Sequence, residues 1–319
     1  MALELRQLRY FVAVAEEGHI TRAAERLGIQ QPPLSRQIKA TELELDVQLF
    51  RRKARGVVLT DAGRAFLDDA RAILADLDQA FESTRRTARG EQGRICVGIT
   101  PSASFHPLLS HAIRSFRAAF PLVSLTLEER LSNELVNRLR DEHMDVAFIR
   151  TSFTDLERLV ITPLLDEPMV AVLPDGHPLT RGRTAATISL KQLANEAFIL
   201  GEPGTGTYEA TIAACRASGF SPRVVQRAPR VTSSLGLVAV GLGIALVPAS
   251  IQRMHMEGVV YRRLKGSPQS TVRLSLASRR ADPSTVVRQF LNLVKNVGRF
   301  GREKSARVGR PRSLDSPPR

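Results

Sequence analysis

The sequence predicts an α-helical winged helix-turn-helix domain, then one long helix, then an α/β domain. Three observations support this prediction. Apolar residues at helical spacing surround a glycine turn before residue 45, apolar residues repeat every 3.5 residues after residue 60, and strands and helices alternate after residue 91. The 319 residues also exceed what one hydrophobic core supports, so several folding units are expected.

The first 45 residues have the spacing of a helix-turn-helix. Apolar side chains fall on one face of a helix over residues 5–17, which Gly18 ends. Thr21 is expected to cap a short second helix, and Gly28 suits the tight turn after it. A third helix begins near Gln31, where prolines are tolerated because the N–H groups of a first helical turn are unpaired anyway.

The third helix is expected to bury Leu34, Ile38, Thr41 and Leu45, which recur with 4-3-4 spacing. The residues that remain toward its N-terminal end and outer face are candidates for contact with DNA: Gln31, Pro32, Pro33, Ser35, Arg36 and Lys39. Gln pairs with adenine and Arg with guanine in the major groove. Isolated charges are more often an ordinary solvated helix face, but the turn placed just before them favours DNA reading.

Residues 49–59 predict two short extended segments around a basic turn, which is a wing. Its cations are candidates for phosphate contacts: Arg51, Arg52, Lys53 and Arg55. The net charge of +14 fits a phosphate-bearing partner, although it also suits an acidic membrane or an anionic ligand. Residues 1–90 hold 15 Lys/Arg against 13 Asp/Glu, so local clusters rather than bulk charge must locate a DNA site.

Thr60 is expected to cap a long helix. Its apolar positions step by 4 and 3 in turn, which is the period of a coiled-coil seam and predicts a dimer: Phe66, Ala70, Ile73, Leu77, Ala80 and Thr84. The alternative is a lone amphipathic helix packed on its own domain, because three heptads are short.

The segment 89–93 breaks this helix and opens the alternating pattern. Strands are expected at 95–99, 123–129, 146–149, 170–173, 198–200, 224–227, 244–247, 259–264 and 272–277. Helices are expected at 108–119, 132–141, 189–195, 208–218, 232–241 and 284–297. The alternation predicts mostly parallel sheets. Residues 299–319 are rich in Gly, Pro, Ser and Arg and predict a disordered basic tail.

Several classes of protein are disfavoured. Cys96 and Cys215 lie far apart, which indicates a reducing compartment and favours buried inert thiols over a redox switch. The first residues lack the apolar stretch of a signal peptide and residues 235–252 contain Gly, Pro and polar residues, so a cytoplasmic protein without a membrane partner is expected. His106 and His111 have no ligand spacing, and no nucleophile motif is present, so neither a metal, nor a cofactor, nor an enzyme is expected.

Several segments together have the pattern of one family. They are residues 5–18, Ala23-Ala24 with Leu27, Gln31-Pro-Pro-Leu-Ser-Arg-Gln-Ile38, Leu49-Phe50 and Leu59-Thr60-x-Ala-Gly63. They resemble the LysR-type transcription regulators, and the resemblance extends to about residue 298. The run Gly241-x-Gly243-Ile-x-Leu-Val-Pro-Ala-Ser250 resembles the branch that regulates aromatic-compound and muconate catabolism. Two departures are Thr41, where the family usually has Leu, and Arg51-Arg52 in place of Glu-Arg.

The resemblance implies a sequence-specific DNA-binding regulator whose C-terminal domain has two Rossmann-like lobes, similar to periplasmic solute-binding proteins, with a small effector between them. The expected boundaries are 1–59 for the winged helix-turn-helix, 60–90 for the dimerisation helix, 91–298 for the effector domain and 299–319 for the tail. Lobe I would hold 91–163 and 268–298, and lobe II 164–267.

The implied partners are double-stranded DNA, an organic-acid effector, the chain itself as a dimer of dimers, and RNA polymerase. A periplasmic binding protein or a transferase of the same bilobal fold is the alternative, opposed by the helix-turn-helix.

Ser102 and Ser132 match positions where muconate-responsive relatives hold a carboxylate, although either could be a helix N-cap. The full set of candidate effector residues is Ser102, Ser132, Arg150, Pro203, Gly204, Thr205 and Thr232. Arg150 could instead pair with Asp145 or Asp155. The loop 201–207 lacks the ending of a nucleotide-binding loop, so a ligand-contacting helix start is preferred. The expected apolar walls of a site for an aromatic or unsaturated acid are Phe105, Phe153 and Tyr208.

Overall fold

The computed structural model describes residues 3–54, 56–150, 158–181, 187–266 and 270–308, with side chains as far as Val297. The predictions for Arg55, Phe153, Asp155 and residues 309–319 lie outside the described residues. The chain divides into two compact units, Met1–Thr87 and Ala88–Arg319.

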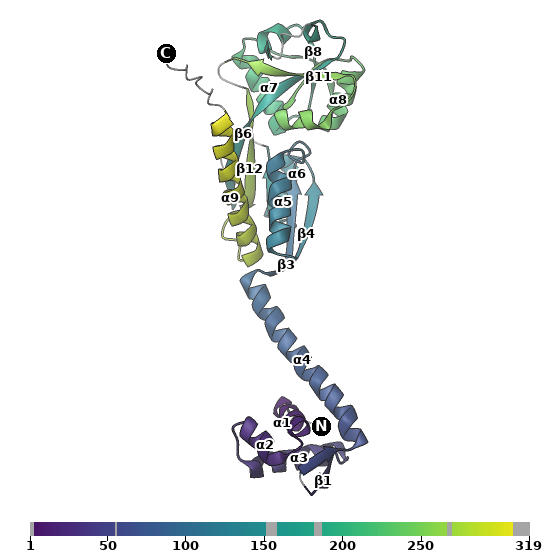
Figure 1. Cartoon of the computed structure of the whole chain (residues 1–319). Helices are drawn as coiled ribbons and strands as arrows, with labels where there is room; N and C mark the ends of the chain where they lie inside the picture. Colours follow the sequence, from purple (N-terminus) through teal and green to yellow (C-terminus); the bar gives the residue numbers. More distant parts are fainter. Residues whose placement is uncertain (1–2, 55, 151–157, 182–186, 267–269, 309–319) are drawn as a thin grey trace, which may run out of the picture. The chain divides into compact units, whose positions relative to one another are not determined.

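The N-terminal unit is the predicted winged helix-turn-helix (Figure 1). Its elements are α1 (Leu5–Glu17), α2 (Ile20–Arg26), α3 (Gln31–Leu45), β1 (Phe50–Lys53) and β2 (Gly56–Leu59). The two strands pair antiparallel and form the wing. The expected Thr21 cap is wrong: His19 is the N-cap of α2, and its Nδ1 accepts a hydrogen bond of 3.2 Å from the Thr21 backbone N–H. The imidazole therefore satisfies an N–H group that the Thr hydroxyl was expected to serve.

The core face of α3 is as expected. Leu34, Ile38 and Thr41 are buried, and Leu45 is half-buried against the same core. The Thr41 hydroxyl donates a hydrogen bond of 3.0 Å to the Gln37 carbonyl oxygen. A polar group is tolerated at this apolar position because its hydrogen bond is made within the helix.

Helix α4 (Asp61–Arg89) starts where the sequence predicts. The Thr60 Oγ1 accepts a hydrogen bond of 2.9 Å from the Gly63 N–H, as a cap does. Ala70 is buried in the core of the N-terminal unit, whereas Ile73 and Phe81 are 45% and 52% exposed. The first part of the apolar stripe thus packs on its own domain, and the later part is left uncovered in this chain.

The C-terminal unit is built on a mixed sheet. Its strands are β3 (Gln92–Ile99), β4 (Leu122–Glu129), β5 (Val146–Ile149), β6 (Leu159–Pro174), β7 (Thr187–Ser189), β10 (Ala245–Pro248), β11 (Val259–Lys265) and β12 (Thr271–Arg279). They pair in the order β4-β3-β5-β12-β6-β11-β7, with β10 also on β6, while β8 (Ala197–Leu200) and β9 (Arg223–Arg227) form a separate parallel pair. The prediction of mostly parallel sheets is wrong, since β12 and β10 both run antiparallel to β6.

Strand β6 links two lobes of this unit. Residues 159–168 pair with β12 in lobe I, and residues 169–174 pair with β10 and β11 in lobe II. The sequence predicted only 170–173 as strand, because Pro163, Asp166 and Glu167 interrupt the apolar pattern before it. Pro163 lies beside the register shift between Leu274 and Ser275, a place where a strand tolerates proline. The pairing changes lobe after Pro168, later than the expected boundary at 163.

Helices cover the sheets of both lobes. They are α5 (Pro107–Ala119), α6 (Ser132–Arg140), α7 (Gly206–Ala217), α8 (Val231–Ala239) and α9 (Thr285–Val308), with short 3₁₀ turns at Pro178–Thr180, Leu190–Leu193 and Ala249–Met254. The helix expected at 189–195 is one of these turns. Helix α9 was expected to end at 297, but its backbone continues to Val308.

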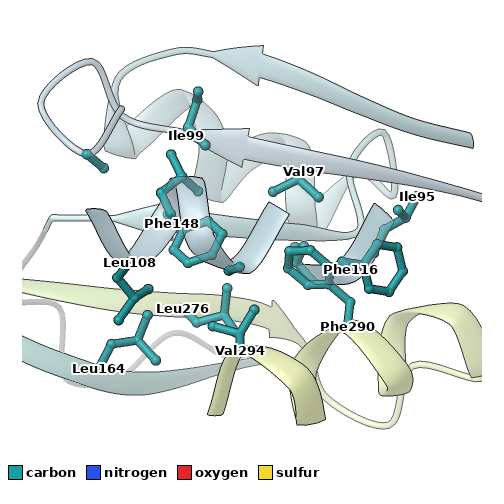
Figure 2. Close-up of a cluster of buried hydrophobic side chains, with 14 of the residues drawn as sticks. Ile95, Val97, Ile99, Leu108, Phe116, Phe148, Leu164, Leu276, Phe290 and Val294 are labelled. Atoms are coloured by element: carbon teal, nitrogen blue, oxygen red, sulfur yellow. The ribbon is translucent and has the colours of Figure 1, made fainter. Parts of the chain in front are cut away.

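The core of lobe I joins the sheet to α5 and α9. Figure 2 shows Phe116 from α5, Phe148 from β5 and Phe290 from α9 gathered in one apolar cluster with strand residues such as Ile95 and Leu276. The Phe116 and Phe290 rings meet edge to face with centroids 5.0 Å apart. This packing fixes the carboxyl ends of β3 and β5, from which the site described below is built.

Candidate functional site

The first candidate site is the outer face of α3 with the wing. Gln31, Pro32, Arg36 and Lys39 are exposed, while Pro33 and Ser35 are half-buried. On the wing, Arg51, Arg52 and Lys53 are exposed as well. Helix α3 thus buries the face that was predicted for the core and leaves most of the predicted polar face accessible.

Ion pairs divide the cations of the N-terminal unit into two groups. Arg22, Arg26, Arg64 and Arg71 pair with carboxylates, as in the Arg71–Glu16 contact of 2.8 Å. Within the described part of the chain, no ion pair engages the cations of α3 and the wing, which are Arg36, Lys39, Arg51, Arg52 and Lys53. The described cations of the predicted DNA surface therefore lack ion pairs, as do Arg9 and Arg86 elsewhere in the unit.

The wing is held against the helices by backbone contacts. The Glu42 carboxylate of α3 accepts hydrogen bonds from the N–H groups of Leu49 and Phe50, at 2.8 and 3.0 Å. The Val57 N–H donates to the Gly18 carbonyl oxygen at 2.9 Å, and a Cβ at Gly56 would lie 2.2 Å from that same oxygen. Only glycine allows this approach. The geometry of the wing and of α3 is thus set by partly buried polar contacts.

The second candidate site is a cavity of about 60 Å³ in the C-terminal unit. It lies where β3 and β5 of lobe I and β8 and β10 of lobe II meet the starts of α6, α7 and α8. Hydroxyl-bearing residues make up much of its lining: Thr100, Ser102, Ser132, Thr205, Thr207, Thr211 and Ser234. Apolar residues such as Leu131, Ile199 and Val247 complete it.

Two of the three helix N-termini at this cavity lack a side-chain cap. The N-cap residues Leu131 of α6 and Arg230 of α8 make no side-chain hydrogen bond to their first turn. The N-terminus of α7 differs, because the Thr205 hydroxyl accepts a hydrogen bond of 3.4 Å from the Tyr208 N–H. Unpaired N–H groups at a helix start attract anions.

Arg150 is the buried cation of the site. It is 1% exposed and its Nη2 pairs with the Glu167 carboxylate, which also accepts a hydrogen bond of 2.6 Å from the Ser250 N–H. Burial lowers the pKa of Arg150, and Glu167 opposes that effect. Burial alone would raise the pKa of Glu167, but the Arg150 charge and the hydrogen bonds from Ser250 hold it below its ordinary value.

Asp145, one of the two predicted alternative partners, does not pair with the Arg150 side chain. Asp145 instead accepts hydrogen bonds from the Cys96 N–H at 2.7 Å and from Arg279 at 3.2 Å, and Asp155 lies outside the described residues. The Nε and Nη1 atoms of Arg150 are buried and have no hydrogen-bond partner. Within the described part of the chain, the cation is therefore only half satisfied.

The predicted effector residues divide into two groups. Ser102, Ser132, Arg150 and Thr205 line the cavity. Pro203, Gly204 and Thr232 lie outside the lining, and the first two are exposed. Ser132 is not an N-cap, because its hydroxyl donates a hydrogen bond of 3.2 Å to the Arg150 carbonyl oxygen. Ser102 lies in the turn after β3, five residues before α5 begins at Pro107, so it does not cap that helix.

Two of the three expected aromatic walls, Phe105 and Tyr208, are not at the cavity, and the third, Phe153, lies outside the described residues. Phe105 and Tyr208 pack against two separate hydrophobic clusters of lobe II and are absent from the lining. Their place is taken by short side chains, among them Ala245, Val247 and Pro248.

Sequence reasoning missed several residues of this site. Thr100 could have been found, because it follows the predicted first strand directly and the ends of parallel strands are where ligands bind. Thr211 stands one helical turn after Thr207, to whose carbonyl oxygen its hydroxyl donates a hydrogen bond of 2.8 Å. No sequence pattern pointed to Glu167, because the predicted strand began only at residue 170. Arg230 and Ser234 line the cavity although only their neighbour Thr232 was predicted as an effector residue.

The position of Gly206 explains why the loop before α7 needs a glycine. A Cβ at this position would lie 1.9 Å from the Arg150 carbonyl oxygen. The start of α7 in lobe II thus touches the end of β5 in lobe I closely enough to require glycine. The loop serves the approach of the two lobes, which explains why it resembles a phosphate loop only in composition.

Other chemistry is not indicated by the described residues. Burial, with a smaller effect of Glu128, raises the pKa of the Cys96 thiol to about 11, and burial raises that of Cys215 to about 11. In the described part of the chain, no group of His, Cys, Asp and Glu side chains could hold a metal ion. None of its helices is both long and apolar enough to cross a membrane.

Comparisons with known proteins cover both sites. Residues 88–299 match the LysR substrate binding domain, and residues 5–64 match the bacterial regulatory helix-turn-helix protein of the lysR family. HTH-type transcriptional regulator BudR of Raoultella terrigena is 38% identical over 293 residues, 91% of this chain and 100% of that protein. HTH-type transcriptional regulator CatR of Pseudomonas putida is 37% identical over 294 residues, which are 92% of this chain and 98% of that protein. The crystal structure of full-length CbnR complexed with its target DNA superposes with a TM-score of 0.82 at 29% identity, covering 93% of this chain and 100% of that one.

Proposed function

Because this chain belongs to the LysR family of DNA-binding transcriptional regulators, we propose that a small carboxylate binds in its inter-lobe cavity and controls transcription. Family membership makes the chain a regulator with an effector-binding domain, so the enzyme alternative is dropped. The relatives include regulators of the branch that the sequence resembles, such as CatR.

The observation that carries the proposal is the half-satisfied guanidinium of Arg150. Its Nε and Nη1, together with the Thr100 hydroxyl, are buried polar atoms of cavity-lining residues, and none of them has a hydrogen-bond partner among the described residues. Leaving such a donor unpaired is costly, about 1–3 kcal/mol and more for a charged group. A carboxylate accepts strong, charge-assisted hydrogen bonds from guanidinium donors of this kind. The uncapped starts of α6 and α8 add further donors for the same anion.

We propose that the exposed face of α3 reads base edges and that the wing binds phosphates. Gln31, Ser35 and Arg36 would contact bases near the start of α3, while Lys39 and the wing cations bind the backbone. Pro32 and Pro33 would hold the first turn of α3 close to the DNA. The support is that these cations are exposed and free of ion pairs while their neighbours are paired.

We propose that effector binding acts by closing the two lobes. Since β6 runs through both lobes, a ligand that bridges them favours one lobe arrangement over another, which is a population shift. The DNA-binding units would pair through residues 60–88, where Ile73 and Phe81 are uncovered, and effector domains would pair separately into a dimer of dimers. The site of action is the cytoplasm, with RNA polymerase as a further partner.

Thermal unfolding of the full chain tests the proposal. Short aliphatic, dicarboxylic and aromatic acids should be compared with their neutral amides, because a ligand that binds the folded state raises its melting temperature. We expect one class of acid, and none of its amides, to raise the melting temperature. Ser132→Ala and Thr100→Val should weaken this shift, whereas Thr232→Val, outside the lining, should not. Equal shifts with acids and amides would remove the carboxylate from the proposal.

A further inference from the structure

Two buried hydroxyl groups at the inter-lobe cavity have already used their hydrogen atoms. The Thr211 hydroxyl donates to the Thr207 carbonyl oxygen at 2.8 Å, and the Ser234 hydroxyl donates to the Arg230 carbonyl oxygen at 3.4 Å. A hydroxyl has one hydrogen to donate and two lone pairs with which to accept. In the described part of the chain neither oxygen accepts a hydrogen bond. Thr211 and Ser234, which are 2% and 6% exposed, therefore offer a ligand acceptors.

The lobe I residues of the same cavity offer donors. The Nε and Nη1 atoms of Arg150 and the Thr100 hydroxyl have no hydrogen-bond partner among the described residues. Thr211 and Ser234, by contrast, belong to α7 and α8 of lobe II. All four residues line the cavity. A ligand that satisfies both lobes must therefore accept hydrogen bonds at one end and donate one at the other.

The volume of the cavity limits the ligand to a small molecule. An apolar cavity of about 150 Å³ holds one benzene molecule. This cavity, at about 60 Å³, has less than half that volume. Its size is fixed where Gly206 brings α7 against the Arg150 carbonyl oxygen, a contact that leaves no room for a Cβ. Acids of the size of glycolate and lactate suit such a cavity, whereas benzoate and muconate are too large.

The charges around the cavity favour one carboxylate over two. Arg150 pairs with Glu167, and Arg230 pairs with Glu129 at 3.8 Å. The uncapped starts of α6 and α8 remain, each with a partial positive charge of about +0.5. Together they balance a single negative charge. A second carboxylate would be repelled by Glu202, which also lines the cavity.

We propose that the effector is a short hydroxy monocarboxylate, of the size of glycolate or lactate; this inference rests on the proposed carboxylate site. The ligand carboxylate accepts hydrogen bonds from Arg150 and Thr100 of lobe I, and the ligand hydroxyl donates to Thr211 or Ser234 of lobe II. A site built to bind a hydroxyl rejects the analogue that lacks it, because a buried group is then left unpaired. The hydroxyl thus adds specificity that the carboxylate contacts alone do not provide.

Isothermal titration calorimetry of the full chain with size-matched acids tests the proposal. Glycolate is compared with propionate, and lactate with isobutyrate, because within each pair a hydroxyl replaces a methyl group. We expect the hydroxy acid of each pair to bind about 10- to 100-fold more tightly, which is the effect of leaving one buried acceptor unpaired. Pyruvate, whose oxo group has no hydrogen to donate, should bind as weakly as the methyl acids. Benzoate and muconate should not bind.

Variants of the two acceptors connect this preference to lobe II. Thr211→Val combined with Ser234→Ala should bring the two acids of each pair to similar affinity without weakening propionate. Thr211→Ser keeps the hydroxyl and should keep the preference. Thr232→Val combined with Ser233→Ala is the matched control, since neither residue lines the cavity, and it should also keep the preference. Should the double variant at the acceptors fail to fold, the two single changes carry the test, because one of them must lower the preference.

The results that would overturn the proposal differ from those that would overturn the carboxylate site. Equal affinity within each pair of acids, or tight binding of pyruvate, would exclude the ligand hydroxyl and leave the carboxylate site intact. Binding of benzoate or muconate alone would exclude the size limit. A double variant that keeps the preference would exclude Thr211 and Ser234 as acceptors. If no acid binds more tightly than its neutral amide, the carboxylate site is wrong, and the hydroxy acid proposal fails with it.

Discussion

In the N-terminal unit the cations of α3 and the wing are exposed and free of ion pairs, whereas in the C-terminal unit Arg150 is 1% exposed and paired with Glu167. The same guanidinium group therefore works in two opposite environments. Exposed cations bind a long polyanion by releasing counterions, and their effect is screened by salt. A buried cation is screened little and admits only an anion that fits its free donors. The difference separates a DNA surface from a small-molecule site within one chain.

The largest expected effect is that of Arg150→Ala on stability. The change leaves the Glu167 carboxylate buried without its partner, so the unfolding free energy of the C-terminal unit should fall by about 3–5 kcal/mol. Arg51→Ala on the wing is the matched change in the other environment, and it should leave the melting temperature unchanged. Chemical denaturation of both variants measures this. Similar losses in the two variants would contradict the comparison.

Acid sensitivity should follow the buried pair. Since the pKa of folded Glu167 lies below its ordinary value of 4.5, ionised Glu167 stabilises the folded state above that value, and the contribution is lost as pH falls through the folded pKa. Glu167→Gln lacks this contribution. The stability difference between wild type and variant should therefore shrink as pH is lowered below 4.5. The measurement is the unfolding free energy against pH, and a constant difference would show that the pKa of Glu167 is not lowered in the folded chain.

The two classes of exposed cation proposed for DNA should separate by specificity. Arg36→Ala should cost about 1–3 kcal/mol on the operator and little on mixed-sequence DNA, because a base contact is lost. Arg52→Ala should weaken binding evenly on both and lower the salt slope by about one, because a phosphate contact is lost. Gel-shift titrations at several salt concentrations distinguish them. Equal losses on both DNAs for Arg36→Ala would move that residue to the phosphate group.

The smallest effect is expected for a cation that is exposed but already paired. Arg26 makes ion pairs with Glu16 and Glu17 in the N-terminal unit. Arg26→Ala should leave the salt slope of DNA binding unchanged, because this guanidinium is occupied by carboxylates of its own chain. The same titration checks it. A fall in the salt slope as large as that of Arg52→Ala would mean that ion pairing does not decide which cations of this unit bind DNA.

The helix-turn-helix could be predicted almost completely from the sequence. Apolar spacing located α1 and α3, and the Thr60 cap marked the start of α4, because helix faces and caps depend on residues three or four positions apart. The same local logic placed Ser102 and Ser132 at the ends of strands, where the cavity lies. Even here one cap was missed, since nothing in the sequence distinguished His19 from Thr21.

The tertiary structure alone decided the rest of the cavity. The Arg150–Glu167 pair joins β5 to a strand that no local pattern revealed, and Gly206 is required because α7 of one lobe meets the backbone of the other. The sheet is mixed because β12 runs antiparallel to β5 and β6, and β10 and β11 run antiparallel to β6. Strand pairing and lobe contact bring together residues distant in sequence, and their partners depend on register and packing, which no window of neighbouring residues contains.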